Sequence, residues 1–280
     1  MLFASAIQPV SLDPRCFARV YNRRMAHSEE IFVGDFASIV SPSASEGTSA
    51  TPSWVPAGFP DPGGGLWTFQ EPNAVVIVRD GRLLVAASPY TRQHDSVQIL
   101  DNAKHMYFST RTFEAPEGGS LRVEWEMSAR IVDGTPGDLY DGFVSFHLLD
   151  MTTGTALDIF AANETVSTVY ARLPFPGAPV PKPESGPRYF SLFDEKVGST
   201  EAGAWNRYAM TYDRSAAAVA YEMNGEVIGR YDDVLPIGPC LLAMGLMTEK
   251  DIEPDKGSTS CHGQGAAGGW AGIRVTLEHG

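Results

Sequence analysis

The sequence predicts an all-β protein, an antiparallel sandwich or jelly roll, on three observations. Short β-prone runs follow one another along most of the chain, and residues 74–78 and 82–87 are an example. Two such pairs are joined by the typical hairpin turns Asp80-Gly81 and Asn224-Gly225. No amphipathic helix of ten or more residues and no internal repeat is evident. The 28 glycines and 20 prolines fit a sheet protein with many turns.

The first 65 residues show little periodic pattern. We expect residues 1–38 to form an N-terminal arm that is partly disordered, and residues 39–65 to form a loop rich in Ser, Pro and Gly. Residues 66–280 are then one jelly roll. The first 24 residues carry four arginines against one acid, which leaves two alternatives open: an organelle transit peptide, or an upstream extension before a start at Met25.

The expected strands follow one another in hairpins. Residues 120–130 show the pattern clearly, because Leu121, Val123 and Trp125 alternate with charged residues as in a half-buried strand. The expected strands are residues 74–78, 82–87, 97–100, 104–110, 120–130, 143–149, 156–161, 165–173, 189–193, 205–212, 217–223, 226–231, 241–247 and 272–278.

Charge and composition exclude several classes of partner. The 21 basic against 34 acidic residues give a net charge of −13, which argues against nucleic acid and anionic membranes as partners. No run reaches the roughly 18 apolar residues of a membrane span. The three cysteines are too few and too widely spaced for a disulfide framework or a zinc site. We expect a cytoplasmic protein with no metal and no cofactor, and the oligomeric state stays undetermined.

The segment FVSFHLLDMTTGTALDIFA, residues 143–161, is the most informative part of the chain. It reads as two strands joined by a turn that contains Gly154. Symmetric closure places His147 opposite Asp158 and Ser145 opposite Phe160, and opposed residues share one face of a sheet. The other face is purely apolar and must be the core. The face that carries chemistry therefore contains Phe143, Ser145, His147 and Asp158.

Further candidate residues lie on either side of this hairpin. On the strand 165–173 we expect Tyr170 and Arg172 to point into the same concavity, where Arg172 would grip a carboxylate or phosphate or would pair with an acidic loop. Residues 174–188, with six prolines, read as a rigid loop over the cleft edge. The expected substrate-binding set is Phe143, Ser145, Tyr170, Arg172, Tyr140 and His94.

Four stretches together carry a resemblance to a known superfamily. They are VVIVRDGRLLVAA, SLRVEWEMSAR, FVSFHLLD followed by ALDIFA, and WNRYAMTYDRSAAAVAYEMNGEVIGRY. In order and spacing they resemble the concanavalin A-like lectin/glucanase superfamily, over about residues 66–279. The resemblance implies a two-sheet jelly roll with a concave face that binds a carbohydrate-like or small-molecule ligand.

The resemblance argues against the usual reaction of this fold. Laminarinase-type hydrolases carry E-x-D-x-x-E, and ALDIFA aligns Ala156 with the nucleophile and Ala161 with the acid/base, so that only Asp158 remains. A retaining glycosidase needs two carboxyl groups about 5 Å apart. The tryptophans that stack on sugars in the family correspond to Phe143 and His147.

Three classes of function remain. The first is an intracellular, non-hydrolytic enzyme of the isomerase, cyclase or lyase type, with a setting in specialised metabolism, in which His147 is the catalytic base and Asp158 orients it. The second is a lectin-like carbohydrate-binding protein without catalysis. The third is a hydrolase that uses other carboxylates. An enclosed pocket favours the enzyme, and flat exposed Trp or Tyr side chains favour the lectin.

Overall fold

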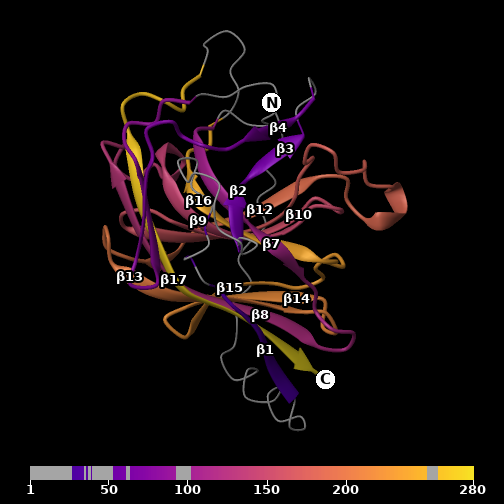
Figure 1. Cartoon of the computed structure of the whole chain (residues 1–280). Coiled ribbons are helices and arrows are strands. Elements are labelled where there is room, and N and C mark those ends of the chain that lie inside the picture. Colours follow the sequence, from indigo (N-terminus) through magenta and orange to yellow (C-terminus); the bar gives the residue numbers. More distant parts are fainter. Residues whose placement is uncertain are drawn as a thin grey trace, which may run out of the picture.

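The computed structural model describes residues 27–34, 36, 39, 53–60, 64–92, 102–250 and 258–280. Two antiparallel sheets are stacked on each other, as Figure 1 shows, so the predicted sandwich is confirmed. The first sheet has the order β15 (Glu226–Tyr231), β14 (Ala218–Met223), β13 (Trp205–Asp213), β8 (Ser120–Val132), β17 (Gly265–His279), β6 (Arg82–Ala87) and β5 (Val75–Arg79), and β1 (His27–Val33) also pairs with β17.

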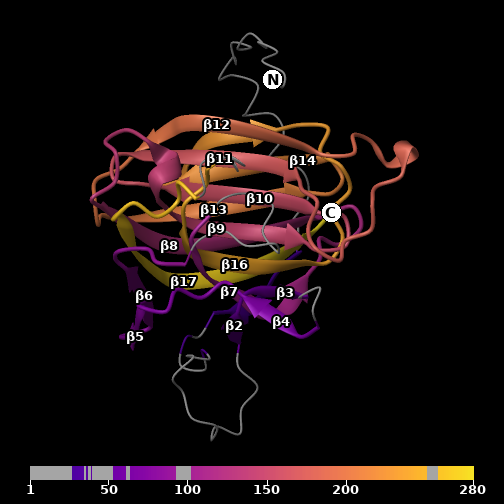
Figure 2. The same ribbon diagram turned by 90° about the horizontal axis from the view of Figure 1, so that it is seen from above.

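The second sheet carries the site, and Figure 2 shows its strands from the outer side. Two 3₁₀ helices, η2 (Leu139–Asp141) and η3 (Pro183–Ser185), and the small hairpin of β3 (Gly58–Pro60) and β4 (Leu66–Thr68) complete the described elements. The order of the second sheet is β12 (Phe190–Ser199), β11 (Thr165–Arg172), β10 (Thr155–Ala161), β9 (Phe143–Asp150), β16 (Cys240–Met247), β7 (Lys104–Phe113) and β2 (Trp54–Pro56).

The two predicted hairpin turns are present. Asp80 and Gly81 have φ values of 52° and 73°, and Asn224 and Gly225 have 53° and 88°. Positive φ at both central residues is the type I′ geometry that matches the twist of the flanking strands. Nothing can be said of the expected strand 97–100, which lies outside the described residues.

The main core fills the space between the sheets. Trp125 of β8 stacks on Phe146 of β9 with ring centroids 4.1 Å apart, and Tyr208 of β13 lies 5.9 Å from Trp125. The alternation of 120–130 places Leu121, Val123 and Trp125 in this core. Burial of such aromatic and aliphatic side chains is the main force that holds two sheets face to face.

The ends of the chain differ from the expectation. β17 pairs with β6 only as far as Ala271. Beyond that point β1 takes the place of β6 and pairs with residues 274–279 of β17. The expected arm therefore contributes a strand, and β2 and β3 lie within the expected loop 39–65. β17 begins at Gly265, seven residues before the expected start at 272. Within it, a Cβ on Gly268 would approach Val144 Cγ1 to 2.7 Å, so glycine permits close contact between the sheets.

A second, smaller apolar cluster covers the outer face of the second sheet. It includes Phe59 and Phe69 from the N-terminal hairpin region and Phe160 from β10, with Phe175 packed against it. The outer face of this sheet is therefore roofed by other parts of the chain. Within the described part of the chain, no helix has the length and hydropathy to cross a membrane.

Candidate functional site

The hairpin of β9 and β10 has the predicted register. His147 is opposite Asp158, Ser145 is opposite Phe160, and Leu149 is opposite Ala156. His147 Nδ1 and Asp158 Oδ1 lie 2.7 Å apart, and the two residues are only 4% and 5% exposed. The predicted pairing of an imidazole with a carboxylate on one face is therefore confirmed.

The second nitrogen of the imidazole is also engaged. His147 Nε2 lies 2.7 Å from Ser145 Oγ, which in turn lies 3.2 Å from the Gly245 carbonyl oxygen. Both ring nitrogens thus have partners within the protein, and the ring is held in one orientation. Asp158 differs, because no described residue donates to its Oδ2. Oδ2 is not fully buried, so it is accessible from the cavity that Asp158 lines.

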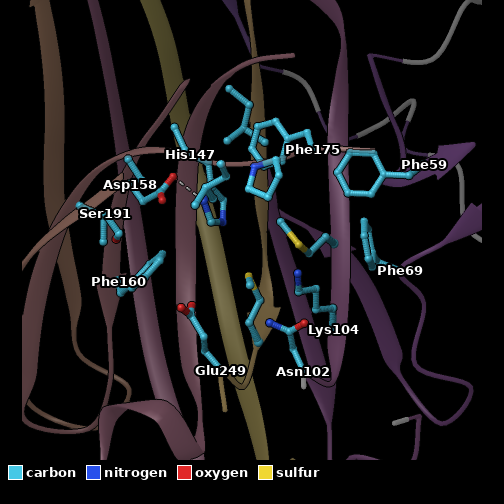
Figure 3. Close-up of a pocket in the computed structure, with 18 of the residues that line it drawn as sticks. Phe59, Phe69, Asn102, Lys104, His147, Asp158, Phe160, Phe175, Ser191 and Glu249 are labelled. Atoms are coloured by element: carbon cyan, nitrogen blue, oxygen red, sulfur yellow. Dashed lines mark hydrogen bonds and ion pairs between the residues drawn. The ribbon is translucent and has the colours of Figure 1, made fainter. Parts of the chain in front are cut away.

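A cavity of about 430 Å³ lies over this face of the sheet. Figure 3 shows His147 and Asp158 on one side of it and Lys104 and Asn102 on another, with Glu249 apart from both pairs. The volume suits a small organic molecule. Most of the wall is apolar: Phe59, Phe69, Met106, Phe108, Leu149, Ala156, Phe160, Val169, Ala171, Leu173, Pro174, Phe175, Pro176, Phe193 and Met247.

The proline-rich loop of residues 174–188 forms part of the roof. Pro174, Phe175 and Pro176 line the cavity, and the Phe175 ring lies 5.9 Å from that of Phe59. The prediction that this loop covers the edge of the cleft is therefore confirmed. Two roof segments that are far apart in sequence meet through an aromatic contact.

Arg172 anchors this loop and does not face the ligand, which corrects the prediction. Its guanidinium donates to the carbonyl oxygens of Thr153 at 3.1 Å, Ser185 at 2.9 Å and Pro187 at 3.2 Å. Because those carbonyls occupy its donors, Arg172 is a structural clamp between the β9–β10 turn and the loop.

Tyr170 also points away from the cavity. Asp158 pairs with Val169, so Val169 and Ala171 share the cavity face, and Tyr170 lies among the residues of the main core. Its hydroxyl accepts a hydrogen bond from the Leu235 N–H at 2.7 Å. Burial raises the pKa of Tyr170 above its usual value. The side chains of β11 that we expected to face the cavity therefore lie on the opposite side of the sheet.

Phe143 and Ser145 do not line the cavity, which corrects the prediction that they bind the substrate; they contact Phe160 and His147, which do line it. The Phe143 ring stacks on Phe160 at 4.2 Å, and Phe160 lines the cavity in the regular register, without a bulge. Ala161 packs in the main core, whereas Ala156 lines the cavity. Of the two alanines that align with catalytic glutamates, only Ala156 therefore lines the cavity.

Tyr140 lies one contact away from the cavity. Its hydroxyl donates to Glu195 Oε1 at 2.8 Å, and its ring lies 5.8 Å from Phe193, which lines the cavity. Burial, with the hydrogen bond to Glu195, raises the pKa of Tyr140. His94 lies outside the described residues. No group of three His, Cys, Asp or Glu side chains in the described ranges is arranged to hold a metal ion.

Sequence reasoning missed Lys104, Asn102 and Glu249, which line the same cavity. Burial lowers the pKa of Lys104 from 10.5 to about 8, although the carboxylates of Glu249 and Asp158 oppose this. Asn102 is 1% exposed, and its Oδ1 has no hydrogen-bond partner among the described residues. One signal was available for Lys104: it alternates with Met106 and Phe108, so a lysine shares the apolar face of its strand.

The chain belongs to a family described as a family of unknown function (DUF6081), which its residues 34–279 match. Its two antiparallel sheets form a β-sandwich, the fold class that the sequence predicted. Comparison with curated proteins gives no match.

Several solved structures are similar to this chain at low sequence identity. An endo-1,3-beta-glucanase from Streptomyces sioyaensis is 18% identical, with a TM-score of 0.49, over 89% of this chain and 96% of that one. An endo-beta-1,4-glucuronan lyase from the fungus Trichoderma reesei is 12% identical, with a TM-score of 0.47, over 74% and 89%. The carbohydrate recognition domain of Emp47p is 15% identical, with a TM-score of 0.41, over 75% and 91%.

Proposed function

We propose that this protein is a non-hydrolytic enzyme that binds a small, largely apolar molecule in the cavity and transfers protons on it. The observation that supports this most directly is the buried His147–Asp158 pair, of which Asp158 faces a largely apolar cavity. One positioned acid/base group can catalyse reactions of the isomerase, cyclase or lyase type without the second catalytic carboxylate of a retaining glycosidase. The cytoplasmic location expected from the sequence remains part of this proposal.

In this proposal Asp158 is the catalytic base and His147 is the positioning residue. The imidazole holds Oδ1 at 2.7 Å and is itself held by Ser145, so Asp158 has one fixed oxygen and leaves Oδ2 for the substrate. This reverses the roles expected from the sequence, where His147 was the base. The reversal rests on the engagement of both ring nitrogens, which leaves neither lone pair nor N–H directed at a ligand.

The walls of the cavity favour this proposal over the lectin-like alternative. Sugar rings stack on flat Trp and Tyr side chains, and no described Trp or Tyr lines this cavity. The Phe side chains that line it are Phe59, Phe69, Phe108, Phe160, Phe175 and Phe193. Few polar groups are present to satisfy the hydroxyl groups of a sugar, and unpaired hydroxyls are costly to bury. A molecule with an apolar body and few polar atoms fits better.

Hydrogen–deuterium exchange at carbon tests proton transfer without knowledge of the natural substrate. The purified protein is incubated in D₂O with phenylacetone, a small apolar ketone with acidic C–H bonds, and exchange is followed by proton NMR. We expect catalysed exchange that falls by about 10²-fold or more in Asp158→Asn, because removal of a positioned base costs about that much. The matched control is Asp194→Asn, a carboxylate on the adjacent part of the same sheet that does not line the cavity.

Two results would count against the proposal. Equal exchange by the wild type and Asp158→Asn would remove Asp158 from the reaction. Micromolar binding of glucan oligosaccharides by a protein that exchanges no carbon-bound proton would support the lectin-like alternative instead.

A further inference from the structure

The ammonium group of Lys104 is in an unusual position for a lysine. It lies 4.9 Å from the centre of the Phe69 ring, and it makes no hydrogen bond or ion pair with any described residue. Lys250 shows the usual arrangement, since its ammonium meets Asp138 at 2.7 Å and Asp141 at 2.6 Å. A lysine whose amine lies in an apolar cavity without a hydrogen-bonded carboxylate is suited to react with a ligand as a base or nucleophile.

Asn102 lies beside Lys104 in the wall of the cavity. It is 1% exposed, it lines the cavity, and its Oδ1 has no partner in the described part of the chain. That oxygen is fully buried, so the part of Asn102 that a molecule in the cavity would contact is the rest of its side chain. Figure 3 shows Asn102 and Lys104 next to each other, with Glu249 apart from them.

We propose that Lys104 forms a covalent imine with an aldehyde or ketone held in the cavity. This rests on the proposed function and names its substrate class: an apolar carbonyl compound. The lowered pKa supports it, because about a tenth of the amine is neutral at pH 7 when the pKa is about 8, against less than a thousandth for an ordinary lysine.

The step conserves atoms and electrons. The neutral Lys104 Nζ attacks the carbonyl carbon, the C–N bond forms, and the carbonyl electron pair moves to oxygen, which takes a proton. The nitrogen gives up a proton, and the neutral carbinolamine carries a hydroxyl on the former carbonyl carbon. It then loses water as the C–O bond breaks and the C=N bond forms. Glu249 lines the same cavity and is the carboxyl group that can exchange the protons. No oxidant or reductant is needed.

Reductive trapping tests the imine directly. The protein is incubated at pH 7 with 3-phenylpropanal and sodium cyanoborohydride, which reduces an imine to a stable secondary amine, and peptide mass spectrometry locates the label. We expect Lys104 to be labelled about ten-fold faster than Lys182, an exposed lysine in the same molecule. This internal comparison needs no variant. In Ala171→Trp, which fills the cavity wall, Lys104 labelling should be lost while Lys182 labelling stays unchanged.

The opposite results would overturn the proposal. Lys104 labelling no faster than that of Lys182, or labelling that persists in Ala171→Trp and in the smaller substitution Ala156→Phe, would show an ordinary amine. Binding of 3-phenylpropionate that is lost in Lys104→Met, with no labelling of Lys104 by the aldehyde, would make the lysine an ionic anchor for carboxylates. In each case the Asp158-dependent exchange of phenylacetone would still stand, so failure of the imine is distinguishable from failure of the proposed function.

Discussion

Replacement of Lys104 with methionine should stabilise the protein at neutral pH. The folded state holds the protonated amine in a poorly solvated cavity, which is why its pKa falls from 10.5 to about 8. At about 1.4 kcal/mol per pKa unit, this difference costs the folded state at most about 3.5 kcal/mol at pH 7. Methionine keeps the apolar stem but loses the cation–π contact with Phe69, worth about 0.5–1 kcal/mol. Water that reaches the half-buried ammonium lowers the cost further, so we expect a gain of about 2 kcal/mol.

The pH dependence gives the sign of the effect. Below pH 8 the amine is protonated in both the folded and the unfolded state, and the cost is complete. Between pH 8 and 10.5 the unfolded state binds more protons, so the stability of the wild type rises with pH relative to the variant. The carboxylates of Glu249 and Asp158 raise the pKa of this amine, and the value of about 8 is the result of burial and these two charges together.

Urea unfolding followed by tryptophan fluorescence at pH 7 and pH 9.5 measures this. The advantage of Lys104→Met should be about 2 kcal/mol at pH 7 and about half of that at pH 9.5. Lys182→Met is the matched control, because Lys182 is exposed and its loss should change the free energy of unfolding by less than about 0.5 kcal/mol at either pH. A Lys104→Met variant that is less stable than the wild type, or an advantage that does not shrink with pH, would refute the reasoning.

Three further predictions follow from the same structure. Arg172→Met removes hydrogen bonds to three carbonyl groups, so it should lower the free energy of unfolding by about 2 kcal/mol and expose residues 174–188 to limited proteolysis, whereas cleavage as slow as in the exposed control Arg188→Met would contradict the clamp. Trp125→Ala should cost about 3–5 kcal/mol in urea unfolding because its stack with Phe146 lies at the centre of the main core, and a loss below about 1 kcal/mol would show that the sheets do not depend on it. Reductive labelling of Lys104 by 3-phenylpropanal should rise steeply from pH 6 to about pH 8 and then level off, and a rate that still climbs to pH 10 would indicate an unperturbed amine.

The hairpin of β9 and β10 could be predicted because its geometry is local. A turn around Gly154 joins two apolar runs, and symmetric closure fixes which residues oppose each other. His147 and Asp158 are therefore paired by sequence separation and strand alternation alone. The turns at Asp80-Gly81 and Asn224-Gly225 could be predicted for the same reason, because each depends on two adjacent residues.

The face of β11 was predicted wrongly for a physical reason. Seven of its eight residues are buried, so both faces are covered, and a contrast between polar and apolar residues no longer tells inside from outside. Val169 and Ala171 face the cavity because the cavity itself is apolar. Tyr170 and Arg172 satisfy their polar groups with backbone partners on the other side.

The sequence by itself determined the strands, the hairpins that join neighbours, and the pairing of an imidazole with one carboxylate, because alternation and turn chemistry act over a few residues. Only the tertiary structure decided that this pair opens onto an apolar cavity that Lys104 and Asn102 also line, since these residues come from strands and segments far apart in the chain. The roof was decided in the same way, by Phe59 and Phe175 meeting across more than a hundred residues. Contacts of this kind depend on how the sheets and loops pack, and no local periodicity encodes them.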